Sequence, residues 1–229
     1  MRKLIILMLV MAIAAPSIHA RKKRPKAGTV KDKVYTDSKH EFKLTLNPNW
    51  KYSIGKAKAH YRITLVQKAY EIPPKYMTAP NYTQIPRLVL YVDTCSLGAK
   101  AVVDSLMSPT YKSDQKSRML REFEILLDGQ MGTGFYRYKV VPRKNRILSI
   151  ADQKAFLWIG KSRYTAEVTE SSSSSTGKRV EGNYGGAIVA IKKGNLLLLF
   201  HVLCEYEYFP SVYKEAMEMI ESVEFLKEG

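Results

Sequence analysis

The alternation of apolar and polar residues predicts a chain built mainly of strands. Phe42, Leu44 and Leu46 lie on one side of an alternating segment at 34–46, and extended chain restarts at Trp50 after an Asn-Pro-Asn break. Further strands are expected at 61–66, 87–95, 135–141 and 155–169. The proline-rich stretch 71–86 predicts a surface loop between two of them.

The strongest local pattern is a pair of apolar runs at 186–191 and 196–204. They flank the turn Lys-Lys-Gly-Asn at 192–195, and this arrangement is typical of a β-hairpin. The second run is apolar at both odd and even positions, so it predicts a central strand covered on both faces.

Helical spacing is clearest near the C-terminus. Val212, Ala216, Met219, Ile220 and Val223 form one apolar stripe, which predicts an amphipathic helix covering the sheet, followed by a short strand at 223–226. A short helix is also expected at 98–107 and another at 114–127, whose last part, 123–127, could instead be a strand.

The N-terminus has the order of a secretory signal. Arg2 and Lys3 precede an apolar stretch at 4–15, which is too short for the roughly 20 residues of a spanning helix. Cleavage is expected near Ala20, with a second candidate after Ala14; an uncleaved anchor is the alternative. Either way the chain is predicted to be exported, to the periplasm or outside the cell.

This gives three parts: a signal peptide at 1–20, a basic flexible segment at 21–33 and a single domain at 34–229. The basic segment is expected to be a solvated leader, because it cannot bury enough apolar area to order itself. About half of the formal charge of +16 lies in the domain.

Contact with an anionic polymer or lipid headgroup is the alternative role for the basic segment, and no specific nucleic acid is expected outside the cytoplasm. The residues assigned to that contact are Arg21, Lys22, Lys23, Arg24 and Lys26.

Two cysteines, Cys95 and Cys204, each end an apolar run. In an exported protein they permit one disulfide, whereas two buried free thiols are the other interpretation. Spacing alone leaves both open.

The segments Phe42-Lys-Leu-Thr-Leu-Asn-Pro-Asn-Trp50 and Ile220-Glu-Ser-Val-Glu-Phe225 resemble the opening strand and closing helix of the PsbP/Mog1-like family. Pro48 and Trp50 are one residue closer than in the commoner form. The resemblance implies an α+β fold in which helices sandwich an antiparallel sheet (α-β-α). It implies non-enzymatic roles for most relatives, and no cofactor or functional residue carries over.

No motif for catalysis, metal or cofactor binding is recognised. The chain has no nucleophile elbow and no His-Glu-x-x-His helix, and the serine run at 171–175 lacks the spacing of a phosphate loop and predicts a hairpin loop instead. His201 and Cys204 are three apart in a strand, so they point to opposite faces. Glu205 and Glu207 would share a face and form the one candidate carboxylate pair.

These patterns favour an exported, non-catalytic binding or assembly module with an unidentified protein partner in the cell envelope. One alternative is a periplasmic, hydrolase-like enzyme that uses Glu205, Glu207 or Asp93. Another is an electrostatic binder of an anionic envelope polymer.

Overall fold

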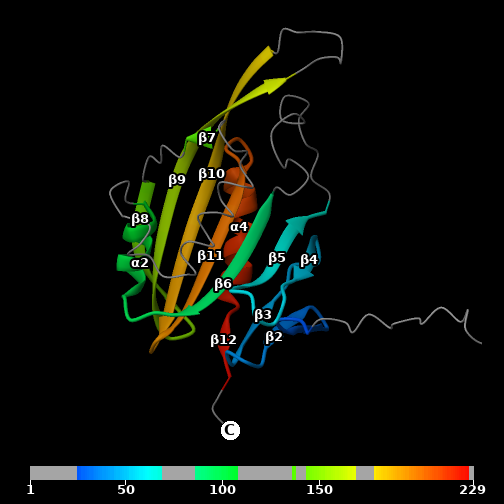
Figure 1. The fold of residues 1–229 in the computed structure, drawn as a ribbon, viewed down its shortest axis with the longest axis vertical. Helices are drawn as coiled ribbons and strands as arrows, with labels where there is room; N and C mark the ends of the chain where they lie inside the picture. Colours follow the sequence, from blue (N-terminus) through cyan, green and yellow to red (C-terminus); the bar gives the residue numbers. More distant parts are fainter. Residues whose placement is uncertain (1–24, 69–85, 108–135, 138–142, 169–177, 227–229) are drawn as a thin grey trace, which may run out of the picture.

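A computed structural model describes residues 25–68, 86–107, 136–137, 143–168 and 178–226. In this described part, the chain consists mainly of strands, with two helices between them and a short strand at its end (Figure 1). In chain order the elements are β1 (Thr29–Lys31), β2 (Val34–Asp37), β3 (Phe42–Thr45), β4 (Trp50–Ile54), β5 (Tyr61–Gln67), β6 (Arg87–Thr94), α2 (Ala99–Met107), β7 (Tyr136–Arg137), β8 (Arg143–Ile150), β9 (Gln153–Val168), β10 (Lys178–Lys193), β11 (Leu196–Glu205), α4 (Phe209–Glu221) and β12 (Glu224–Phe225).

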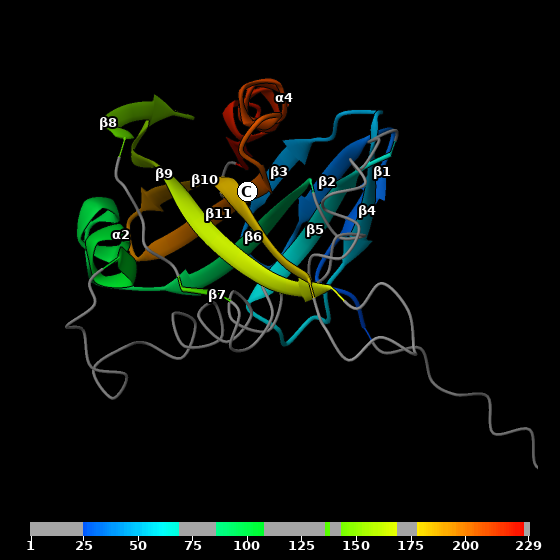
Figure 2. The ribbon, with the colours of Figure 1, turned by 90° about the horizontal axis from the view of Figure 1, so that it is seen from above.

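A large antiparallel sheet has the order β4-β5-β6-β11-β10-β9-β7, with β8 paired to β9 beside β7. A smaller sheet has the order β1-β2-β3-β12, so the last strand joins the first part of the chain. Helices α4 and α2 lie on opposite faces of the large sheet (Figure 2). The predicted α-β-α layering is therefore confirmed. Neither helix of the described segments is long and apolar enough to cross a membrane.

The central strand β11 is buried along nearly its whole length, as its uninterrupted apolar run predicted. Its even-numbered residues, such as Leu198 and Phe200, pack in the core beneath α4. Its odd-numbered residues, such as Leu197 and Leu199, pack with Val102 and Val103 of α2. The two faces of this one strand thus belong to two separate hydrophobic cores.

Helix α4 is held on the sheet at two points, one at its start and one near its middle. Near its start, the ring of Phe209 packs so closely on Gly185 of β10 that a Cβ there would lie 2.4 Å from the ring. Further along, the Glu215 carboxylate accepts hydrogen bonds from Trp50 Nε1 at 2.7 Å and from Gln67 Nε2 at 3.2 Å. Packing and hydrogen bonding together set the position of the helix.

Most predicted elements are confirmed, with two corrections. The segment 34–46 is not one strand: β2 and β3 are joined by a turn in which Glu41 has φ of 55°. The central hairpin turns over two residues, Gly194 and Asn195, rather than four, and Gly194 has φ of 56°. Strands β1 and β8 were not predicted. The helix expected at 114–127 and the loop at 71–86 lie outside the described residues, apart from Pro86.

The expectation of a flexible segment at 21–33 is wrong for residues 25–33. Strand β1 pairs with β2, and the Ala27 N–H donates to the carbonyl of Gly55 at 2.9 Å. Ala27 itself is buried. Composition misjudged this segment because its order comes from backbone pairing with distant strands rather than from apolar side chains of its own.

The reason for that order is a buried arginine, Arg62 of β5, whose exposed fraction is 2%. Its Nε donates to Asp37 Oδ2 at 2.6 Å, and its Nη2 donates to the Ala27 carbonyl at 2.7 Å. Its Nη1 donates to the carbonyls of Ala57 and Ala59 at 3.1 and 2.9 Å. The guanidinium therefore connects β2, β5, the turn after β4 and the N-terminal segment.

Asp37 is fully buried and has several partners besides Arg62. The Tyr35 hydroxyl donates to Asp37 Oδ2 at 3.3 Å, and the backbone N–H of His40 donates to Oδ1 at 3.2 Å. The imidazole Nδ1 of His40 lies 3.1 Å from the same oxygen. Burial alone would raise the pKa of Asp37, but the hydrogen bonds from His40 and Arg62 outweigh it and leave the pKa below its ordinary value.

We expect Arg62→Met to lower the free energy of unfolding by about 3–5 kcal/mol, because it leaves the Asp37 carboxylate buried and without its charged partner. The matched control is Lys43→Met, which breaks the exposed ion pair between Lys43 and Glu224 and is expected to cost about 1 kcal/mol or less. Urea unfolding followed by circular dichroism measures both. Equal losses for the two variants would contradict a special role for Arg62.

We expect stability to fall in acid through Asp37. Because its folded pKa lies below the ordinary 3.8, this group stabilises the fold above that value, and the contribution is lost as the pH falls through the folded pKa. Urea midpoints measured between about pH 2 and pH 7 should therefore drop at the acid end. Asp37→Asn should be less stable at neutral pH and show a smaller acid drop. An acid drop unchanged in that variant would assign it to other groups.

Candidate functional site

Buried polar residues gather on the face of the large sheet that α2 also packs against. Arg87 of β6 and His201 and Glu205 of β11 lie on this face, as the strand register shows, and each is buried. Burial, assisted by the positive charge of Arg87, lowers the pKa of His201 to about 3. The imidazole is thus neutral at physiological pH and belongs to the interior of the sheet.

The predicted carboxylate pair is not formed. Strand β11 ends at Glu205, and the next three residues form a turn in which the Tyr208 N–H donates to the Glu205 carbonyl at 3.1 Å. Glu205 is therefore buried at the end of the strand while Glu207 is exposed in the turn. The prediction assumed that the extended chain continues through Glu207. Asp93, the other acidic candidate, lies near the end of β6, opposite Leu197 at the start of β11, and is therefore far from Glu205. Its Oδ1 lies 3.7 Å from His60 Nδ1.

Both cysteines are free thiols. Cys95 follows β6 and its N–H donates to the carbonyl of Asn195, which precedes β11, whereas Cys204 lies near the other end of β11. At roughly 3.3 Å per strand residue the two are on the order of 30 Å apart, far beyond the reach of a disulfide. The interpretation that permitted a bridge is therefore wrong.

Of the residues assigned to anionic contact, Lys26 lies within the described chain and Arg21 to Arg24 do not. The backbone of Lys26 forms an isolated antiparallel bridge with Lys56, and both side chains are exposed. Lys26 thus adds a cation to the surface of the domain. The proposed contact remains a prediction.

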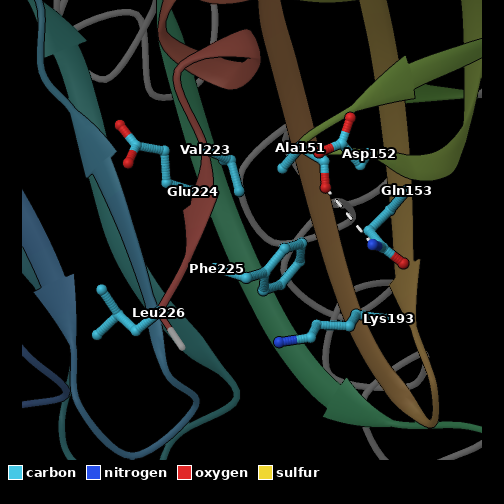
Figure 3. Close-up of a pocket in the computed structure, with 8 residues that line it drawn as sticks. All are labelled: Ala151, Asp152, Gln153, Lys193, Val223, Glu224, Phe225 and Leu226. Carbon is cyan, nitrogen blue, oxygen red and sulfur yellow. Dashed lines mark hydrogen bonds between the residues drawn. The ribbon is translucent and has the colours of Figure 1, made fainter. Parts of the chain in front are cut away.

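A pocket of about 630 Å³ opens at one end of the sheet (Figure 3). We call it the tip pocket. Its described lining comes from three places in the chain: the β8–β9 turn, the end of β10 and the segment around β12. The lining residues are Ala151, Asp152, Gln153, Lys193, Val223, Glu224, Phe225 and Leu226.

Hairpin turns and strand pairing position these side chains. Ala151 and Asp152 have φ of 50° and 58°, the left-handed conformation of a two-residue hairpin turn. Phe225 is held opposite Phe42 by the pairing of β12 with β3, and Leu226 donates its N–H to the Glu41 carbonyl at 2.7 Å. The pocket therefore depends on the closing strand.

The tip pocket combines an apolar wall with separated charges. Lys193 Nζ lies 5.0 Å from the centre of the Phe225 ring, a cation–π contact. Glu224 is paired to Lys43 at 2.8 Å, and Asp152 supplies a second carboxylate. The described lining contains no histidine, cysteine, serine or tyrosine, and the described residues hold no cluster suited to a metal ion. This arrangement suits a bound group that has both an apolar part and a charged part.

Sequence patterns gave no sign of the tip pocket. Its residues are ordinary turn and strand-end residues that become neighbours only when β12 pairs with β3 beside the two hairpins. The one local signal is the predicted closing strand at 223–226, which β12 confirms.

No protein-family model and no curated protein matches the sequence. Solved structures do. PsbP (CyanoP) from Synechocystis sp. PCC 6803 shares 10% identity at a TM-score of 0.45, covering 86% of this chain and 98% of that one. The Ran-binding protein Mog1p from Saccharomyces cerevisiae shares 7% at 0.40, covering 87% and 97%. LpqN from Mycobacterium tuberculosis, described as involved in cell envelope biogenesis, shares 8% at 0.40, covering 81% and 83%.

Both PsbP and Mog1p, which give the PsbP/Mog1-like fold its name, are thus among the structures that this chain resembles. The α+β arrangement that the resemblance implied, an antiparallel sheet between helices, is the arrangement that the structure has. The likeness concerns fold and assigns no function.

We expect the two thiols to differ sharply in reactivity. A maleimide reagent should label Cys95 in the folded protein, since its side chain is partly exposed, and should label Cys204 only after unfolding. Burial, together with the nearby charge of Glu205, raises the pKa of the Cys204 thiol and further slows its reaction. Mass spectrometry of labelled peptides reads the result. A Cys95–Cys204 disulfide peptide from unreduced protein would contradict the structure.

Proposed function

We propose that this chain is an exported, non-catalytic binding module of the cell envelope that holds a protein partner at the tip pocket. The observation that carries this proposal is the pocket itself: an open site of about 630 Å³ with an apolar wall and a cation, whose described lining also holds two carboxylates. Export rests on the signal-like N-terminus, which stays a prediction from the sequence.

The lining suits one anchoring side chain of a partner. Phe225 and the buried Val223 offer apolar surface, and interfaces are commonly anchored by an aromatic or aliphatic side chain inserted into such a site. Lys193 can pair with a carboxylate of the partner while remaining over the Phe225 ring. Asp152 would then disfavour partners that place a second acidic group beside it.

The hydrolase alternative receives less support from the same residues. Of its candidates, Glu205 is buried in the sheet, Glu207 is exposed in the turn after β11, and Asp93 lies opposite Leu197, far along the strands from both. The nearest histidine on β11, His201, is also buried. A general base needs access to the substrate and a pKa suited to proton transfer. A neutral His201 with a pKa near 3, enclosed in the interior, does not meet either condition.

The electrostatic alternative is favoured by one specific observation, the neighbouring exposed Lys26 and Lys56 at the point where the basic segment joins the domain. Such a surface would bind anionic polymers with a strong dependence on salt. It would not depend on the tip pocket, so the two proposals can be separated by substitution.

The test captures partners from the envelope fraction of the native host with the chain beginning at Arg21. We expect a discrete partner whose capture falls about tenfold with Lys193→Glu, because reversal of this charge removes the cation from the pocket and adds a third carboxylate to it. The matched control is Lys214→Glu on the exposed face of α4, which should leave capture unchanged. Quantitative mass spectrometry of the bound fractions measures the difference.

The same capture with a chain lacking residues 21–24 tests the electrostatic alternative. Capture lost with these residues, retained by Lys193→Glu and abolished by moderate salt would assign function to the basic segment. No discrete partner for any form of the protein would overturn the binding-module proposal.

A further inference from the structure

The edge strand β8 leaves one side of its backbone without a partner strand in the described part of the chain. It pairs with β9 on its inner side, in register from Arg146 to Ile150, and no other described strand pairs with it. An open edge presents unpaired N–H and C=O groups that can pair with another chain. Natural proteins usually cover or blunt such an edge.

At the opposite edge of the same sheet, the N-terminal segment pairs with the chain just beyond strand β4. Strand β4 leads directly into residues 55–57, and the N-terminal segment adds to the outer side of that stretch. Ala27 N–H donates to the Gly55 carbonyl and Ala57 N–H to the Pro25 carbonyl, both at 2.9 Å. The described chain thus adds backbone next to the end of β4, and no described strand lies on the outer side of β8.

Cationic residues and a bulge blunt the first part of β8, whereas its regular part carries an exposed apolar side chain. Ile147 is 72% exposed, the largest exposed fraction among the big hydrophobic residues described. It lies beside Phe156 of β9, in the regular part of the strand rather than at the bulge between Arg143 and Arg146. A β-branched residue at this position favours pairing with an added strand.

The charge of this hairpin selects the occupant. Arg143, Lys144 and Arg146 of β8 and Lys154 of β9 are cationic, whereas Asp152 is the acidic residue between Arg143 and Lys154. Arg146 and Lys154 are exposed. A second copy of the chain pairing edge to edge would place these cationic strands side by side, and that repulsion disfavours a homodimer. An acidic strand would be attracted.

We propose that the outer edge of β8 binds an extended acidic segment of a partner protein, which adds to the sheet as a further strand. This inference rests on the proposed binding function and specifies how the partner docks. Main-chain hydrogen bonds supply affinity in strand addition, and alternate side chains supply selectivity.

The register of β8 defines the selectivity. Arg146 lies opposite Leu157, on the face of the sheet beneath α4, and Ile147 lies opposite Phe156, on the face that α2 covers. A bound strand would place a glutamate or aspartate beside Arg146 and a β-branched residue beside Ile147. Alternation of acidic and β-branched residues is therefore the pattern that this edge recognises.

The experiment uses the chain beginning at Arg21 and a synthetic, end-blocked peptide that alternates glutamate and valine. We expect the peptide to slow amide hydrogen exchange within 143–150, and expect a matched lysine–valine peptide to have no effect. Arg146→Glu should weaken binding of the acidic peptide about tenfold, as removal and reversal of one exposed charge contact imply. Arg146→Gln should weaken it less. The control is Lys51→Glu on β4, the opposite edge strand, which should leave binding unchanged.

Several outcomes would overturn the inference. They are absence of protection in β8, equal protection by the lysine–valine peptide, and equal losses from Arg146→Glu and Lys51→Glu. Binding of heparin with the same dependence on Arg146 but no amide protection would identify a site for anionic polymers instead. If Lys193→Glu abolishes capture from the envelope fraction while β8 shows no protection, the binding module stands and strand addition fails. Near-ultraviolet circular dichroism of each variant confirms that it is folded.

Discussion

The fold depends on one charged side chain placed where charge is costly. Four donor contacts from the Arg62 guanidinium reach Asp37 and the carbonyls of Ala27, Ala57 and Ala59, so little of its desolvation cost is left uncompensated. Apolar packing would hold the large sheet together without it. What Arg62 adds is specificity: the small sheet and the N-terminal segment meet the large sheet in the arrangement that forms these four hydrogen bonds. The buried Arg62–Asp37 pair thus contributes more to the relative placement of the two sheets and the N-terminal segment than to net stability.

Arg62 also illustrates which features of the fold could be predicted from the sequence and which could not. The central hairpin and α4 were predictable because each is defined by a local pattern, either two apolar runs around Gly194 or one apolar stripe ending near Val223. Arg62 follows Tyr61 in an alternating strand, and alternation assigns it to solvent. Its burial arises because a segment 35 residues earlier folds over it, and no local pattern contains that information. The order of the N-terminal segment was missed for the same reason.

The candidate site shows the limit more sharply. The carboxylate pair was inferred from period-two spacing, which holds only while the strand continues, and β11 ends at Glu205. The tip pocket joins a turn near Asp152, a strand end at Lys193 and the closing strand at Phe225, and each of these is unremarkable in its own neighbourhood. The spacing of the cysteines likewise could not show that Cys95 and Cys204 lie at opposite ends of paired strands. Chemistry-bearing residues were visible in the sequence, but their neighbours were determined by topology.

The two ends of the large sheet differ in what lies beside them, and this difference bears on the proposed function. Just beyond β4, the N-terminal segment contacted by Arg62 pairs with residues 55–57. At the β8 edge, the described chain adds nothing, although its cationic residues discourage contact between copies. The tip pocket begins at Ala151, the residue that follows β8. A partner strand added to β8 would therefore run toward the pocket, where its end or an adjoining side chain could reach Lys193. In that arrangement the strand edge supplies backbone affinity and the pocket supplies selection, and neither alone would define the partner.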